Sequence, residues 1–221
     1  MKKEIRSIES FDQIQFKDFG RLILTQGDQE SLTVEADEEL LPELITEVRN
    51  GKLNLGIEND WFRRIGKVFS SVFSSREHKV IYTLTFVNLN AVSISGQCNL
   101  ECDRLETDNL KLNVSGLGNL KFGHLDVDNL KVIISGRGEF SAQGRADMGE
   151  LRISGSGEYQ APDLASQSLK VVISGQGNAN VRVAESLDIT ISGLGQVNYY
   201  GQPKIRQVIS GLGKSKRLNE A

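Results

Sequence analysis

The chain has 221 residues, enough for one large domain or two small ones, and its formal net charge is −3 with acidic and basic residues interspersed. No overall basic field therefore points to a nucleic-acid or anionic-lipid partner. Twenty-two glycines against three prolines indicate a chain with many tight bends rather than a disordered linker.

The N-terminal residues MKKEIRSIES carry two lysines without the apolar stretch of a secretory signal, so we expect no signal peptide here. No window approaches the roughly 18 apolar residues of a membrane span, so we also expect no transmembrane segment.

The first ninety residues read as short strands. Apolar and polar residues alternate in FDQIQF (11–16), RLILTQG (21–27) and SLTVEAD (31–37), and a turn is expected at Leu41-Pro42. ITEVR and KLNLGI flank Asn50-Gly51, the strongest short signal for a β-hairpin. We expect irregular coils that cap one end of a longer stack.

Residues 60–76 form an insertion with apolar residues at helical spacing and basic residues beside them. A helix or ordered loop that covers the open core is one interpretation. A surface for a partner or for self-association is another, and a helix on a membrane surface is a third. The residues of the partner surface would be Trp61, Phe62, Arg63, Arg64, Phe69 and Phe73.

A short phrase, Val/Ile-Ser-Gly, then recurs seven times at nearly even spacing. Its serines are Ser95, Ser115, Ser135, Ser154, Ser174, Ser192 and Ser210. Apolar residues stand one and three places before the serine, which is the alternation of a β-strand, and only Gln207 breaks this pattern. A period of about 20 residues predicts a solenoid whose coils stack at about 4.8 Å, with strands paired in parallel.

Two glycine columns follow each strand. The first glycine is present in all seven copies, and the second is present in six, with Cys98 replacing it in the first copy. Such glycines indicate backbone positions that need φ > 0 or a close approach to the neighbouring coil. Because the next segment is another strand, we read these glycines as corners rather than as a phosphate-binding loop.

No residue pattern identifies a reaction, a cofactor or a metal site. The stacked serines have no recurring histidine beside them and are expected to form hydrogen bonds along the stack. Glu139 and Glu158 fall on adjacent coils, which resembles the carboxylate pair of glycoside hydrolases, but we favour the simpler interpretation of two exposed acids on a polar edge. Cys98, Cys102 and His124 lack metal-ligand spacing, so we expect two free, buried thiols.

The ISGxG phrases, following SFDQIQFKDFGRLILTQGDQESLTVEADEELLPELITEVRNGKLNL, resemble the GIN-domain family of auto-transporter adhesin heads, from about Phe11 to Gly213. The resemblance implies an all-β, single-stranded, right-handed parallel β-helix (a solenoid) in which each repeat forms one coil, with an irregular N-terminal cap. It also implies a bacterial module of the cell surface or periplasm, with no catalytic residues to carry over.

The expected organisation is one continuous unit: irregular coils over 1–90, regular repeats over 91–213 and a tail over 214–221. For function we expect a non-catalytic binding or structural module that uses an elongated repetitive surface, with a protein, a polysaccharide or a second copy as partner. The alternatives are a carbohydrate-active enzyme on a β-helix and a cytoplasmic scaffold that self-assembles.

Overall fold

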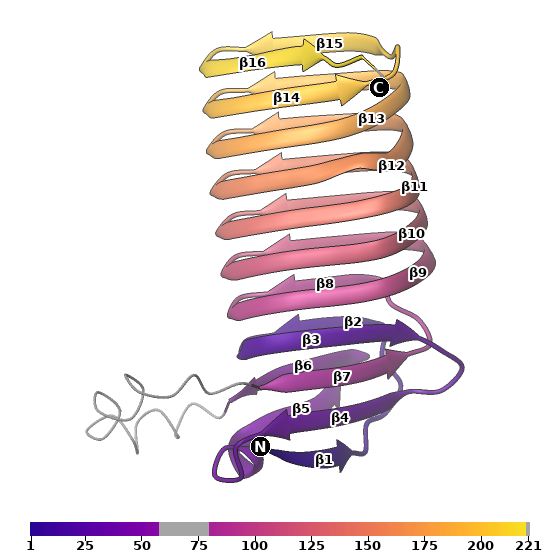
Figure 1. Ribbon diagram of the computed structural model, residues 1–221, viewed down its shortest axis with the longest axis vertical. Helices are drawn as coiled ribbons and strands as arrows, with labels where there is room; N and C mark the ends of the chain where they lie inside the picture. The colour runs from indigo at the N-terminus through magenta and orange to yellow at the C-terminus, as the bar shows by residue number, and fades with distance from the viewer. Residues whose placement is uncertain (58–79, 220–221) are drawn as a thin grey trace, which may run out of the picture.

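The computed structural model describes residues 1–57 and 80–219 as one stack of β-coils (Figure 1). The regular part consists of long strands that bend around the stack: β9 (Gln97–Val114), β10 (Leu117–Ile134), β11 (Arg137–Ile153), β12 (Ser156–Ile173) and β13 (Gln176–Ile191). Each pairs in parallel with the next, residue for residue, with short register shifts in three of the pairs. In these regular coils a single strand therefore continues around the bend.

The coil is right-handed, as expected. In Figure 1 the strands on the near side run from left to right, the chain turns back at the right and returns along the far side, and each turn rises toward the C-terminus. The Ser-Gly corners close each turn at the opposite edge, between one strand and the next. Each coil thus has two broad walls, a bend edge and a corner edge.

The core follows from the alternation within each strand. In the first six copies of the phrase, the side chains one and three places before the corner serine point inward and are almost fully buried, as at Val92 and Ile94. The column after the corner stacks Phe140 on Tyr159, with ring centroids 4.8 Å apart, and Phe122 of the next inward column packs against Phe140 with ring centroids 5.9 Å apart. Apolar columns that run along the axis hold successive coils together.

The N-terminal strands join this stack out of chain order. They are β1 (Lys2–Arg6), β2 (Gln13–Phe16), β3 (Phe19–Gln26), β4 (Ser31–Ala36), β5 (Leu44–Arg49), β6 (Lys52–Ile57), β7 (Ile81–Phe86) and β8 (Ala91–Ile94). β2 lies between β6 and β8, and β3 lies between β7 and β9, all in parallel. The coil that precedes the first repeat in space is therefore built by residues 13–26, and the coil of β6 and β7 lies beyond it.

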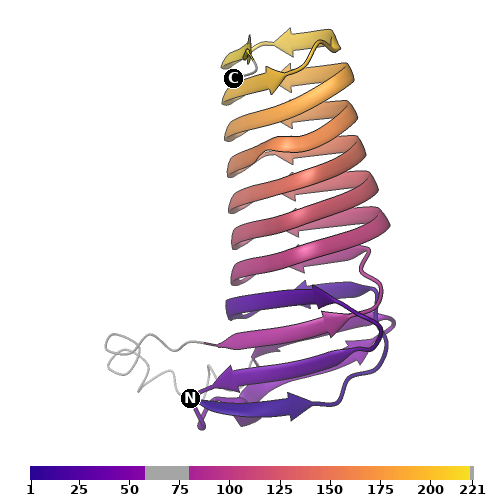
Figure 2. The same ribbon diagram turned by 45° about the vertical axis from the view of Figure 1, so that its right-hand side comes forward.

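Antiparallel strands end the stack at this side (Figure 2). β4 pairs with β7, β5 with β6, and β1 with β4, all antiparallel. The turn η1 (Leu41–Glu43) buries Leu41, and the backbone oxygen of Leu41 accepts a 2.7 Å hydrogen bond from Arg6. The hairpin at Asn50-Gly51 is confirmed, since both residues have positive φ (51° and 72°), as a type I′ turn needs.

At the C-terminal side the stack finishes with β14 (Leu194–Tyr200), β15 (Lys204–Ile209) and β16 (Leu212–Arg217). β15 pairs with β13, and β16 pairs with β14. Within the described ranges no helix is long and apolar enough to cross a membrane.

Candidate functional site

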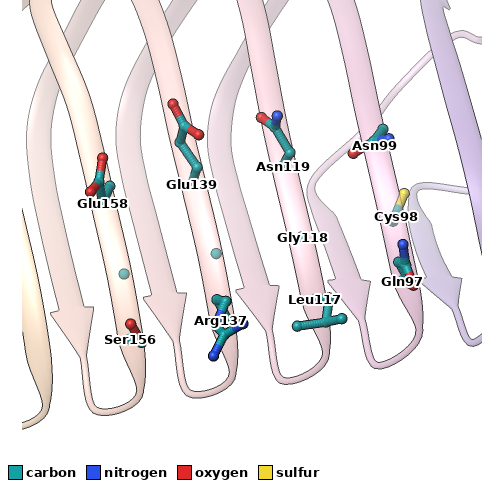
Figure 3. A pocket seen from close by; sticks show the side chains of 12 residues that line it. Gln97, Cys98, Asn99, Leu117, Gly118, Asn119, Arg137, Glu139, Ser156 and Glu158 are labelled. Carbon is teal, nitrogen blue, oxygen red and sulfur yellow. The ribbon is translucent and has the colours of Figure 1, made fainter.

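An open trough runs along the wall next to the corner edge. Over the first coils it is lined by Gln97, Leu117, Arg137 and Ser156 on one side and by Asn99, Asn119, Glu139 and Glu158 on the other. Figure 3 shows these two columns on neighbouring coils, with Cys98 between them on the first coil and Gly118 on the next. The same columns continue through Gln176, Leu194 and Leu212, and through Asn178, Gln196 and Lys214. At about 4.8 Å per coil, seven coils give a trough about 29 Å long.

The floor of the trough is backbone, and a side chain added at its glycines would press on the core. A Cβ at Gly157 would lie 3.1 Å from Ile153 Cγ2, and one at Gly177 would lie 2.8 Å from Ile153 Cδ1. These positions point into the core, beneath the isoleucines of the repeated phrase. Because the second glycine column has no side chains, the strand backbone packs directly on the inward isoleucines. The backbone also forms a shallow floor between two rows of outward side chains.

The corner glycines have a different role. A Cβ on any of the seven would meet a backbone carbonyl of the preceding coil, and none of the seven has φ in the left-handed region. The corner column thus needs close approach between coils rather than positive φ. The stack also continues past Cys98, because Cys98 lies in register with both Gly118 and Gly20.

Glu139 and Glu158 are partners across neighbouring coils, as the repeat predicts. Both are exposed on the open wall, and the residues that line the trough along these coils include no histidine. Two of the corner serines form hydrogen bonds between coils. The hydroxyls of Ser95 and Ser115 donate to the backbone oxygens of Phe16 and Ile94 in the preceding coil. The arrangement offers hydrogen-bond donors and acceptors in rows, as a binding surface does.

A buried polar group lies where the regular repeats meet the N-terminal coils. Asp18 occupies the corner-glycine position of the β2–β3 coil, accepts 2.7 Å and 2.5 Å hydrogen bonds from the Phe19 N–H and the Tyr82 hydroxyl, and is 4% exposed. Burial raises the pKa of the Asp18 carboxyl, and burial beside that carboxyl raises the pKa of the Tyr82 hydroxyl. The sequence signal was present, because KDFG stands where other coils have SGxG, but only the strand register identifies it.

The remaining candidates do not come together. Cys98 and Cys102 are free and buried, as expected, whereas His124 is exposed on the bend edge. In the part of the chain that the structure describes, no group of histidine, cysteine, aspartate and glutamate is suited to hold a metal ion. The proposed partner surface of Trp61, Phe62, Arg63, Arg64, Phe69 and Phe73 lies outside the described residues and stays a prediction.

Solved structures share this fold over nearly the whole chain. The chain is 23% identical to a putative adhesin from Bacteroides fragilis, with a TM-score of 0.86 over 98% of this chain and 96% of that one. It is 22% identical to a putative lipid binding protein from Parabacteroides distasonis (TM-score 0.73, 99% and 96% covered) and 21% identical to a putative adhesin from Parabacteroides merdae (TM-score 0.67, 99% and 96% covered). At these identities the likeness concerns the fold.

No curated protein matches the chain. The comparisons give no support to the carbohydrate-active enzyme or to the cytoplasmic scaffold. Residues 10–203 match the family described as "Putative auto-transporter adhesin, head GIN domain", so the chain belongs to that family and is an adhesin-like head domain by membership.

Proposed function

We propose that the protein is a non-catalytic binding module that holds an extended, neutral, hydroxyl-rich polymer along the trough. The observation that carries this proposal is the recurrence of amide side chains along the trough, on four of its seven coils, beside a backbone floor. Amides donate and accept hydrogen bonds, which suits the hydroxyl groups of a polysaccharide. Weak contacts that repeat along about 29 Å of one polymer chain combine into a higher overall affinity, so a deep pocket is not needed.

The charge of the trough supports a neutral ligand. Arg137 and Lys214 are balanced by Glu139 and Glu158, so neither sign dominates along its length. The trough is also open to solvent, and its side chains stand on strands fixed by pairing on both sides over most of the stack. Such a preformed surface loses little conformational entropy when it binds.

Calorimetric titration with neutral glucan fragments of increasing length tests the proposal. We expect affinity to rise with fragment length until the trough is filled. Changing Asn119 and Asn178 together to alanine should weaken binding about tenfold or more, since each lost hydrogen bond contributes about 1 kcal/mol. Changing Lys111 and Lys170 to alanine on the opposite wall is the matched control. Equal losses in the two variants, or affinity independent of length, would contradict the proposal.

A protein ligand is the second candidate, and exposed leucines of the same column favour it. Leu117 and Leu194 are each 45% exposed beside the trough. Changing both to serine should weaken adhesion to an immobilised protein partner and leave polysaccharide binding nearly unchanged. The asparagine variant should have the reverse effect, so the pair of variants separates the two ligands.

A further inference from the structure

The last coil has an open backbone edge. β15 pairs only with β13, and β16 pairs only with β14, among the residues that the structure describes. The Ser210 N–H donates back to the Ile191 oxygen at 2.9 Å, and successive residues of a strand face opposite sides. Ile205, Gln207 and Ile209 therefore direct their backbone groups away from the stack. Figures 1 and 2 show nothing beyond this coil at the C-terminal end.

Apolar side chains are exposed at the same edge. Ile205 and Ile209 are 41% and 36% exposed, whereas their register partners one coil below, Leu187 and Ile191, are fully buried. In every earlier coil the inward side chains are covered by the next coil of the stack. The inward side chains of β15 have no such cover among the described residues.

The interior of the coil is nevertheless partly closed by polar groups. Gln207 follows Ile189 in an otherwise apolar column, and Ser215 follows Val197. The Ser215 hydroxyl donates a 2.6 Å hydrogen bond to Gln207 Oε1, which joins β16 to β15 across the end of the core. A second complete coil with an apolar interior would bury this polar pair. A single added strand would use the free backbone edge and leave the pair intact.

The edge is strongly basic. Lys204, Arg206, Lys214, Lys216 and Arg217 lie on β15 and β16, and residues 201–219 contain no aspartate or glutamate. Within the described ranges, only Arg206 has a carboxylate in reach, that of Asp188 at 3.8 Å. The same edge of a second copy would bring five cations against five, which disfavours pairing of two such ends. The complementary partner is acidic.

We propose that β16 is the docking edge for an extended acidic segment of another protein, which adds one strand to the stack by β-augmentation. Acidic side chains at alternate positions of that segment pair with Lys214 and Lys216, which point outward. Small residues between them fit over Gly213 and Ser215, which face inward. This edge shares Lys214 with the end of the polymer-binding trough, but the test of the polymer proposal changes Asn119 and Asn178, so the two proposals can fail separately.

Fluorescence anisotropy with a short labelled peptide of alternating glutamate and threonine tests the proposal. We expect saturable binding, weakened about two- to thirtyfold when Lys214 and Lys216 are changed to glutamine, because two exposed ion pairs at an edge are lost. Changing Lys111 and Lys170 to glutamine removes the same charge from a wall and should leave the affinity unchanged. A peptide with a central proline should bind about tenfold more weakly or worse, since proline removes a backbone donor of the added strand.

Three results would overturn the proposal. Equal affinity of the proline peptide would mean that charge alone attracts it, without strand pairing. Binding to phosphatidylserine vesicles with no binding to the peptide would identify a lipid surface as the partner. No peptide binding, together with aggregation of the Lys214→Gln/Lys216→Gln variant, would mean that the cations protect the edge from pairing with other chains.

Discussion

The corner glycines give the sharpest test of how the coils are held together. In Gly136→Ala, the new Cβ would lie 2.7 Å from the Ser115 carbonyl carbon and closer still to the Gly116 oxygen. Both atoms belong to the backbone of the preceding coil, so no side chain can turn away to make room. An ordinary contact needs about 3.4 Å, and the corner must therefore open by about 0.7 Å or more.

Opening the corner would strain three backbone hydrogen bonds. They run from Ser135 N and Gly136 N to the Val114 oxygen, at 2.8 and 3.1 Å, and from Arg137 N to the Gly116 oxygen, at 3.0 Å. At about 1 kcal/mol each, their loss sets the scale of destabilisation at about 3 kcal/mol. For a chain of this size that corresponds to a fall in Tm of about 6–12 °C.

Equilibrium unfolding in urea, followed by circular dichroism and checked for reversibility, measures this change. Gly56→Ala is the matched control, because its Cβ would meet only Lys17 Cβ at 3.5 Å and the residue has no positive φ. The control should stay within about 0.5 kcal/mol of the wild type. A Gly136→Ala protein as stable as the control would refute the reasoning that close approach fixes the corner.

Three further outcomes are expected. Because burial raises the pKa of Asp18, this group should add a downward slope to the free energy of unfolding of the wild type as the pH rises from about 4 through the folded-state pKa. Asp18→Asn should remove that slope in unfolding measured across a pH series, and an unchanged slope would contradict the assignment. Burial raises the pKa of both Cys98 and Cys102 to about 12, so a thiol reagent at pH 8 should label them slowly in the native protein and quickly in denaturant. Rapid native labelling of both thiols would show that they are accessible. Phe140→Ala should cost about 3–5 kcal/mol, because the ring lies between Phe122 and Tyr159 in the core, whereas the control Met148→Ala, at a 57% exposed position, should change little in the same urea titration.

The regular coils were predictable because each position of the repeat has the same structural role in every coil. Seven serines at nearly constant spacing identify the corner, and the alternation before them identifies the inward face. The two outward columns beside the second glycine then follow from the same alternation. The rows that line the trough, including the neighbours Glu139 and Glu158, could therefore be named before the fold was known.

The arrangement of the first ninety residues was not predictable in the same way. Local alternation identifies β2, β3, β4, β5 and β6 as strands, but it does not say which strand each one pairs with. The placement of residues 13–26 beside β8 and β9 depends on contacts between positions far apart in the chain, such as Phe16 and Ile94. β1 escaped prediction because KKEIR has too few apolar residues to show alternation. The division into residues 1–90, 91–213 and 214–221 stays a prediction.

The out-of-order N-terminal coils have a consequence for how such a chain can change its length. The backbone of a coil between Ser95 and Ser192 pairs only with the coil before it and the coil after it. Duplicating or deleting one period would therefore re-form the same kind of strand pairing on both sides. The N-terminal coils cannot be duplicated or deleted in this way, because β2 and β3 pair on both sides with strands that come later in the chain. Growth and loss of coils in related chains should therefore occur on the C-terminal side of β8, in steps of one whole period of the repeated phrase. The N-terminal coils would keep the same length whatever the number of regular coils that follow them.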